Sequence, residues 1–488
     1  MLRVVRPWLP CKRLSRISIR PVCVSNSCWF TTLAIESSCD DTSVAILERV
    51  TPREPTSNSR NGAYICFHEK ITANSKAYDG IHPIIALESH QVNLARLVDR
   101  ALQYLPRSDE QINGLKLNQQ ENIGDNVRHS GDGYASEVRI PDLVSVTRGP
   151  GMRSNLSVGL DFAKGLGVAW QRPLVGVHHM QAHALTPRLV CALHEKRRDV
   201  TPSFPFLSLL VSGGHTLLLH SSSLVSHTTL ATTTDIAIGD ALDKIARVVL
   251  HQTVITRSTS TMFGPLLERF AFPNGSADYD GYETPNTRAQ ELTRRVTEWG
   301  WGFQPPLAVT QSGTRNKSME YSFSGLCSAA ERFVERGGSG ERRQHNISED
   351  ERRDLAREAM RVAFEHLATR VVLGLNNMKE IDQDMAEKIT TLVISGGVAA
   401  NGFLKKVLRS YLDARGYGRV DLVFPPVELC TDNAAMVAWA GMEMFEAGYE
   451  TDLGCRPLRK WSMDPHAEDG GILGVGGWRE RRQESRVG

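Results

Sequence analysis

Two histidines with the spacing of metal ligands stand near the middle of the chain. His179 and His183 follow an apolar stretch, 173–177, that predicts a strand. On a helix, residues i and i+4 share one face, so two imidazoles can bind one cation. Much later, Asp432 precedes a predicted helix and is a candidate third ligand. Met180 occupies the position of the Glu in His-Glu-x-x-His, which argues against a zinc protease.

Two Gly-Gly turns lie between these candidate ligands. Ser212-Gly213-Gly214-His215 follows an apolar run at 206–211, and Ser395-Gly396-Gly397 follows another at 392–394. Glycine lets backbone N–H groups approach an anion closely, so both turns are candidate phosphate cradles. Together with the histidines, they suggest metal-assisted chemistry on a nucleotide. Each feature alone has a structural reading, because HxxxH and Ser-Gly-Gly both recur without function.

The remaining elements must position these groups. The repeated strand–Ser-Gly-Gly unit suggests a duplicated α/β lobe with a cleft between the copies. We expect an N-terminal lobe at 33–205, a C-terminal lobe at 206–445 whose last helix packs back on the first lobe, and a tail at 446–488, loose from about 464. His178 would close a strand rather than bind metal. Predicted helices cover 83–104, 155–170, 236–249, 354–375, 403–412 and 433–445, and predicted strands cover 33–35, 43–47, 143–146, 206–211, 216–220 and 392–394.

Composition excludes several classes of protein. The chain has 488 residues, of which 41% are hydrophobic and 23% charged, as in a globular protein with a large core. It contains no apolar stretch long enough to span a membrane, so we expect no membrane partner. Its nine cysteines include no Cys-x-x-Cys pair, which argues against a zinc ribbon and a disulfide scaffold.

The first residues differ from the rest. They carry six arginines and lysines and no acid before Glu36, which is typical of a mitochondrial transit peptide over 1–32. A basic tail without a targeting role is the alternative. Loss of this leader would change the net charge from +2 to −4, so any RNA contact would depend on local basic clusters. Segments 106–137 and 248–262 read as insertions.

Six motifs in order resemble one family, the tRNA N6-threonylcarbamoyladenosine transferases, once called O-sialoglycoprotein endopeptidase-like, and the leader resembles that of the mitochondrial branch. The motifs are Ile35-Glu36-Ser37-Ser38-Cys39-Asp40-Asp41-Thr42, Gly176-Val177-His178-His179-Met180-Gln181-Ala182-His183, Leu210-Val211-Ser212-Gly213-Gly214-His215-Thr216, Tyr321-Ser322-Phe323-Ser324-Gly325-Leu326, Ser395-Gly396-Gly397-Val398-Ala399-Ala400-Asn401 and Cys430-Thr431-Asp432-Asn433.

The resemblance implies a two-lobed actin/sugar-kinase-like α/β fold, with a mixed sheet flanked by helices in each lobe. It implies transfer of threonylcarbamoyl from threonylcarbamoyl-AMP to N6 of adenosine 37 in mitochondrial tRNAs reading ANN codons. A separate synthase would make the donor. The resemblance to the mitochondrial branch implies a homodimer that is located in the mitochondrial matrix.

The resemblance also implies site residues. His179, His183 and Asp432 would hold one divalent cation, with zinc, iron and manganese all compatible with this ligand set. Asp40 would position or deprotonate the adenine amine, and an Asx-turn or helix N-cap is its alternative role. The residues implied to contact the donor are Leu210, Val211, Ser212, Gly213, Gly214, Asp243, Gly264, Glu268, Ala400, Asn401 and Thr431.

Some positions depart from the family pattern. Gln181 replaces an acidic residue, which removes a possible carboxylate behind the metal ligands. Asp240 replaces a Glu, and 262–265 replaces a more Gly-rich loop. Three rival functions remain. The first is an actin-like ATPase or small-molecule kinase, which would not need the histidine pair. The others are another carbamoyl-adenylate transferase and a scaffold without activity.

Overall fold

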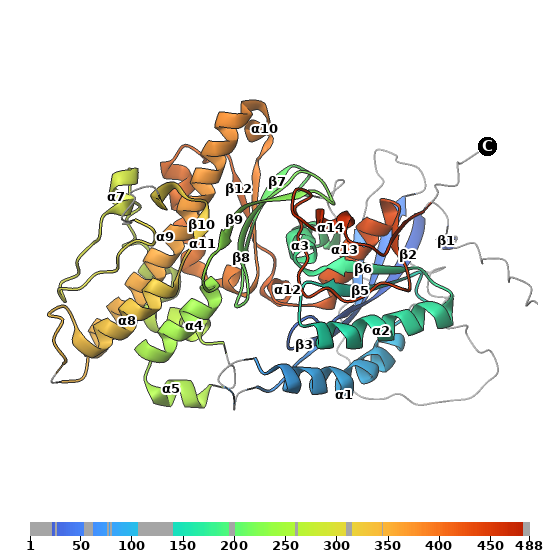
Figure 1. The fold of residues 1–488 in the computed structure, drawn as a ribbon, viewed down its shortest axis with the longest axis horizontal. Coiled ribbons are helices and arrows are strands. Elements are labelled where there is room, and N and C mark those ends of the chain that lie inside the picture. The colour runs from blue at the N-terminus through green and yellow to red at the C-terminus, as the bar shows by residue number, and fades with distance from the viewer. Residues whose placement is uncertain are drawn as a thin grey trace, which may run out of the picture.

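The computed structural model describes residues 22–24, 27–52, 62–75, 78, 81–105, 140–194, 201–258, 262–308, 315–343 and 345–481. The predicted insertion at 106–137 and most of the predicted leader lie outside these residues. Within them, the elements form two lobes side by side (Figure 1). None of the helices described is long and apolar enough to cross a membrane.

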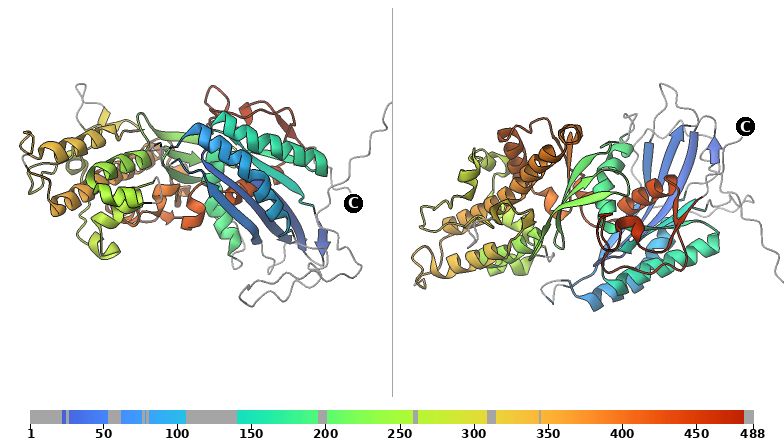
Figure 2. Two further views of the ribbon diagram at one scale, coloured as in Figure 1. Left: turned by 90° about the horizontal axis from the view of Figure 1, so that it is seen from below. Right: turned by 45° about the horizontal axis from the view of Figure 1, so that its top comes forward.

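The first lobe is built on a mixed sheet in the order β4-β3-β2-β5-β6, with β1 paired to β2. Its elements are β1 (Val22–Val24), β2 (Ser27–Glu36), β3 (Asp41–Pro52), β4 (Gly62–Thr72), β5 (Leu143–Gly149), β6 (Leu174–His178), α1 (Pro83–Leu102), α2 (Arg153–Trp170), α3 (His179–Leu193) and α13 (Ala434–Glu446). Helices α1 and α2 pack on one face of the sheet, and α3 and α13 pack on the other (Figure 2). The last long helix therefore belongs to the first lobe.

The second lobe holds the sheet β10-β9-β8-β7-β11-β12. Its strands are β7 (Phe206–Val211), β8 (Thr216–Ser221), β9 (His227–Thr233), β10 (Glu320–Tyr321), β11 (Thr391–Ser395) and β12 (Asp421–Val423). Its helices are α4 (Ile238–Val249), α5 (Gln252–Arg257), α6 (Gly264–Ala271), α7 (Arg288–Leu292), α8 (Ser324–Arg336), α9 (Glu349–Ile381), α10 (Gln383–Lys388), α11 (Gly402–Ala414) and α12 (Val427–Cys430), with 3-10 turns η2 (Gly275–Tyr279), η3 (Arg315–Lys317) and η4 (Gly397–Ala400).

The two sheets share one topology. In the first, β3 pairs antiparallel with β2 and β4, and β2, β5 and β6 run parallel. In the second, β8 pairs antiparallel with β7 and β9, and β7, β11 and β12 run parallel. The duplicated two-lobed fold implied by the resemblance is therefore present. The prediction that each strand–Ser-Gly-Gly unit marks one copy of the duplicated lobe is wrong. Both Ser-Gly-Gly turns follow strands of the second sheet, and these two strands, β7 and β11, are adjacent.

Helix α3 lies between the lobes and contacts both sheets. One apolar cluster accordingly combines Leu185 of α3 and Trp439 of α13 with Leu210 and Val393 of the second sheet. Burial of such side chains stabilises a fold by about 1.5–3 kcal/mol each, so this cluster holds the two lobes together. Any residue at the start of α3 is fixed relative to both lobes.

Two predicted terminal segments overlap folded elements. Strand β2 begins at Ser27, and Thr31 and Thr32 are fully buried in it, so the predicted leader overlaps the first sheet, and its end at residue 32 stays a prediction. The loose tail is wrong, because Trp461 and Ile472 are buried against the first lobe. The tail segment contains β13 (Tyr449–Thr451), α14 (Gly471–Gly474) and β14 (Trp478–Glu480), with β13 and β14 paired. Aromatic burial outweighs the polar, Gly-rich composition of this segment.

Candidate metal and donor site

The start of α3 places the histidine pair. Strand β6 is wholly buried and ends at His178, whose Nδ1 accepts from the backbone N–H of Met180 and Gln181. The Nε2–H of His178 donates to the Trp461 carbonyl at 3.0 Å, and burial lowers the pKa of this histidine to about 3. His178 thus closes the strand, as the sequence predicted, and also caps α3 as a neutral imidazole, which the sequence did not suggest. His179 is the first residue with helical geometry.

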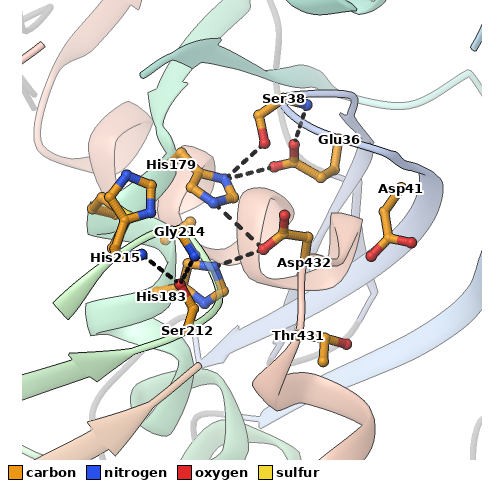
Figure 3. A network of polar contacts seen from close by, with 12 residues as sticks. Glu36, Ser38, Asp41, His179, His183, Ser212, Gly214, His215, Thr431 and Asp432 are labelled. Atoms are coloured by element: carbon orange, nitrogen blue, oxygen red, sulfur yellow. Dashed lines mark hydrogen bonds and ion pairs between the residues drawn. The ribbon is translucent and has the colours of Figure 1, made fainter. Parts of the chain in front are cut away.

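His179, His183 and Asp432 converge on one point (Figure 3). Oδ1 of Asp432 lies 3.4 Å from Nε2 of His179 and 3.1 Å from Nε2 of His183. Both rings are almost fully buried and stand edge to face, with centroids 4.8 Å apart. Two imidazole nitrogens and one carboxylate oxygen that face each other form a donor set suited to a divalent transition metal, with further positions open to substrate or water.

Asp432 reaches this point from the turn between α12 and α13. Asn433 caps α13 by accepting from Met436 N–H at 2.9 Å, which fixes the turn. Burial acts to raise the pKa of Asp432, but the neighbouring charge of His179 and hydrogen bonds from both histidines hold it well below its usual range. The carboxylate is therefore ionised, as a metal ligand must be.

Glu36 is a site residue that we did not predict. Its Oε2 lies 3.1 Å from Nδ1 of His179 and also accepts from the Thr147 hydroxyl at 2.5 Å, while Oε1 accepts from Ser38 N–H. A carboxylate behind a ligating histidine fixes the ring and its tautomer. The sequence signal that could have identified Glu36 is its position directly after the predicted strand 33–35, within the first motif.

The side chain of Gln181 makes no hydrogen bond to the candidate metal ligands. Gln181 is fully buried and donates to the Leu224 carbonyl at 2.8 Å, away from the histidine pair. A carboxylate at this position would face that carbonyl instead of a histidine. The carboxylate that contacts His179 comes from Glu36 of the first sheet, and the effect of an acid at position 181 stays a prediction.

The turn after β7 lies beside the triad (Figure 3). The Ser212 hydroxyl accepts from the N–H of Gly214 and His215, so these two groups already have a partner. Neither Gly213 nor Gly214 has a positive φ, and an added Cβ at either would meet nothing within 4 Å. The glycines therefore keep the surface of the turn open. Leu210 and Val211 are buried at the end of β7 and can offer only main-chain groups.

Asp243 and Gly264 meet at the start of α6. Oδ1 of Asp243 accepts from the N–H of Phe263 and Gly264 at 2.7 and 2.8 Å. Burial raises the pKa of Asp243, although these two hydrogen bonds oppose the rise. This carboxylate thus has a structural role in capping α6, which the sequence did not suggest, and only its second oxygen remains for a ligand.

Glu268 and Asn401 are brought together in the second lobe. Oε1 of Glu268 accepts from Gly402 N–H at 2.7 Å and from the Tyr279 hydroxyl at 2.9 Å. Asn401 caps α11 by accepting from Leu404 N–H, and it follows Ala400, the last residue of η4. The residues implied to bind the donor therefore lie at and after the end of β7, after β11, on α4 and α6, at the start of α11 and directly after α12. The ends of parallel strands are where α/β sheets bind ligands.

Asp40 and Thr431 complete the predicted set. Asp40 is half-buried before β3, and burial together with the charge of Asp41 raises its pKa to about 6. The helix N-cap alternative is wrong, because the chain continues into a strand. Thr431 accepts a hydrogen bond at 2.9 Å from Lys70, which the sequence had not singled out.

Comparison with known proteins places this site in context. A model of the family described as tRNA N6-adenosine threonylcarbamoyltransferase matches residues 121–439. The chain is 34% identical over 99% of its length, and 100% of the relative's, to the mitochondrial tRNA N6-adenosine threonylcarbamoyltransferase of Schizosaccharomyces pombe. It is 31% identical over 88% of its length, and 95% of the relative's, to tRNA N6-adenosine threonylcarbamoyltransferase of Brucella ovis.

Two solved structures align with most of this chain at low identity and low TM-scores. HypF of T. kodakarensis aligns with 13% identity and a TM-score of 0.39, covering 88% of this chain and 49% of that one. The ROK hexokinase of Thermus thermophilus aligns with 14% identity and a TM-score of 0.34, covering 85% of this chain and 100% of that one. On the full-length sequence match and the family model, the chain belongs to the tRNA N6-adenosine threonylcarbamoyltransferase family.

Proposed function

We propose that the protein transfers the threonylcarbamoyl group from threonylcarbamoyl-AMP to N6 of adenosine 37 in mitochondrial tRNAs reading ANN codons, releasing AMP. The observation that carries this proposal is the convergence of His179, His183 and Asp432 beside the turn after β7, in a member of this family. The name of the S. pombe relative and the acid-free leader support a mitochondrial location, and tRNA substrates would place the enzyme in the matrix.

The metal site has a defined task in this reaction. The Nε2 atoms of His179 and His183 and Oδ1 of Asp432 would hold one divalent cation of zinc, iron or manganese. When bound, this cation would neutralise negative charge that develops on the phosphate of the leaving AMP. Glu36 contacts Nδ1 of His179 and would so leave Nε2 to hold the cation.

The second lobe would bind the nucleotide part of the donor. The open turn of Ser212, Gly213 and Gly214, continuing the main chain of Leu210 and Val211, would approach the phosphate. The free carboxylate oxygens of Asp243 and Glu268 would accept from ribose hydroxyls. Gly264, Ala400, Asn401 and Thr431 would contribute the remaining contacts.

Asp40 would act on the adenine amine. A general base works best when its pKa lies near the operating pH, and the pKa of Asp40 is raised to about 6. Its carboxylate would orient N6 for attack on the carbamoyl carbon and receive a proton as the new bond forms. AMP would carry the electron pair of the broken bond away.

Two partners follow from this reaction. The donor would come from a separate synthase and tRNA would be the acceptor. The resemblance to the mitochondrial branch, rather than the reaction, implies a homodimer. Analysis of modified nucleosides in mitochondrial tRNA from a deletion strain tests the proposal, together with purified protein, donor and tRNA. We expect loss of the modification in vivo and AMP release that depends on tRNA in vitro. Full modification without the protein, or ATP-dependent phosphorylation of a small molecule by it, would contradict the proposal.

A further inference from the structure

A lysine of the first lobe lies beside the metal site. Lys70 is on the edge strand β4, and its ammonium donates to Oδ2 of Asp41 at 3.0 Å and to Oγ1 of Thr431 at 2.9 Å. Thr431 immediately precedes the candidate metal ligand Asp432. Lys70 therefore joins two segments 361 residues apart and contacts the residue next to a candidate metal ligand.

The ammonium of Lys70 has two hydrogen-bond partners among the described residues. Asp41 and Thr431 engage two of its three N–H donors, and the third has no partner in the part of the chain that the structure describes. Asp41 also accepts from the Thr72 hydroxyl, so the carboxylate that anchors the lysine is itself fixed. The Lys70 side chain remains 28% exposed, which leaves the third donor accessible from outside. A fixed cation with one open donor is a subsite for an anionic oxygen.

The donor offers two anionic groups, its phosphate and its threonine carboxylate. The groups proposed to hold the nucleotide, including Asp243 and Glu268, all belong to the second lobe. Lys70 and Asp41 belong to the first. A donor whose adenosine lies against the second lobe directs its opposite end, the threonine carboxylate, toward the first.

We propose that Lys70 binds the carboxylate of the threonylcarbamoyl group and so selects this donor over acyl-adenylates without a carboxylate. The assignment rests on the proposed function and adds a specificity-determining residue to it. A charge-assisted hydrogen bond of this kind changes affinity by about ten- to a hundredfold. The effect belongs to donors that carry the carboxylate and leaves the binding of AMP alone unchanged.

The test compares two unreactive donor analogues that differ only in whether the threonine carboxylate is present or replaced by hydroxymethyl. Dissociation constants are measured by calorimetry for the wild type, K70M and K70R, with AMP as a third probe. We expect the wild type and K70R to prefer the carboxylate analogue about ten- to a hundredfold. K70M should bind both analogues equally and AMP as the wild type does. K164M is the matched control, because Lys164 has similar exposure but donates to the Cys455 carbonyl.

The alternatives give distinct outcomes. A K70M variant that keeps the preference would overturn the assignment, as would a wild type that shows none. Weaker AMP binding by K70M would show that Lys70 supports the nucleotide, either through the phosphate or through Thr431, and would overturn it too. Transfer to tRNA is measured in parallel, and a wild type that binds the carboxylate analogue selectively without modifying tRNA would contradict the proposed function while supporting the lysine subsite.

Discussion

Glu36 lies 3.1 Å from His179, with Oε2 facing Nδ1, although the two residues are 143 positions apart. A carboxylate can only accept here, so Nδ1 carries the proton and Nε2 is directed to Asp432. The buried Thr147 hydroxyl and Ser38 N–H hold the carboxylate in turn. One strand end of the first sheet thereby sets the orientation of a ligand on α3.

Glu36→Gln should therefore weaken metal binding. Loss of such a partner typically costs about ten- to a hundredfold in metal affinity. Competition with a chelator, measured at constant pH, provides the affinity. Gln181→Met is the control, because Gln181 is equally buried near the pair but faces the Leu224 carbonyl. Equal metal affinity in wild type and Glu36→Gln would show that the contact does not support the site.

His179→Ala and His183→Ala should each lose metal and tRNA modification while the protein stays folded. Each change removes one of three ligand atoms that lie within 4.8 Å of one another. Metal content per chain, circular dichroism and modification activity are measured on the same preparations. Normal metal content together with normal activity in either variant would rule out that histidine as a ligand.

Asp432→Ala and Asp243→Asn should separate metal binding from donor binding. Asp432→Ala should lower metal content and turnover even at saturating donor. Asp243→Asn keeps an oxygen for the N–H groups of Phe263 and Gly264, so α6 remains capped, but it loses the charged contact to ribose. Its affinity for the donor should fall about ten- to a hundredfold at unchanged metal content. If Asp243→Asn lost metal and Asp432→Ala lost only donor affinity, Asp243 would be the metal ligand and Asp432 the donor contact.

Activity should rise with pH through the pKa of Asp40. Burial and the charge of Asp41 raise this pKa to about 6, and a base works only when deprotonated. The logarithm of kcat/KM should increase with slope one below about pH 6 and level off above it. Asp40→Asn should abolish this limb along with most activity. A flat profile from pH 5 to 8 in the wild type would exclude Asp40 as the base.

Stability should fall in mild acid, in part because of His227. Burial lowers its pKa to about 4, and its two nitrogens contact Ser221 and the Leu224 carbonyl. The unfolded chain binds a proton at about pH 6.5 and the folded chain only near 4, so the free energy of unfolding decreases between these values. The loss is at most on the order of 3 kcal/mol. In His227→Gln, the free energy of unfolding measured by urea titration should depend less on pH between about 4 and 6.5. The same pH dependence in the variant and the wild type would contradict this role of His227.

Two truncations should separate targeting from folding. Removal of residues 1–21 leaves all described strands and should give an active enzyme that stays in the cytosol. Removal of residues 1–32 also deletes Thr31, whose backbone N–H donates to Asp142 and whose hydroxyl donates to Glu48. That variant should be insoluble. Mitochondrial location of the shorter deletion would place the targeting signal elsewhere.

The sequence alone determined what depends on local spacing. The i, i+4 separation of His179 and His183, the strand before them and the order of six motifs were sufficient to predict the ligand pair and to identify the family and most elements. These features depend on residue type and on helix and strand periodicity, and both can be recognised from residues that are close together in the sequence.

Only the tertiary structure decided which distant side chains meet. Adjacent pairing of β7 with β11 places both Ser-Gly-Gly turns in one lobe, which their sequence pattern did not indicate. Glu36 reaches His179, and Lys70 reaches Thr431, because the apolar faces of α3 and α13 must be buried between the sheets. Hydrophobic burial sets these contacts without a local sequence pattern, since it depends on area rather than on order along the chain.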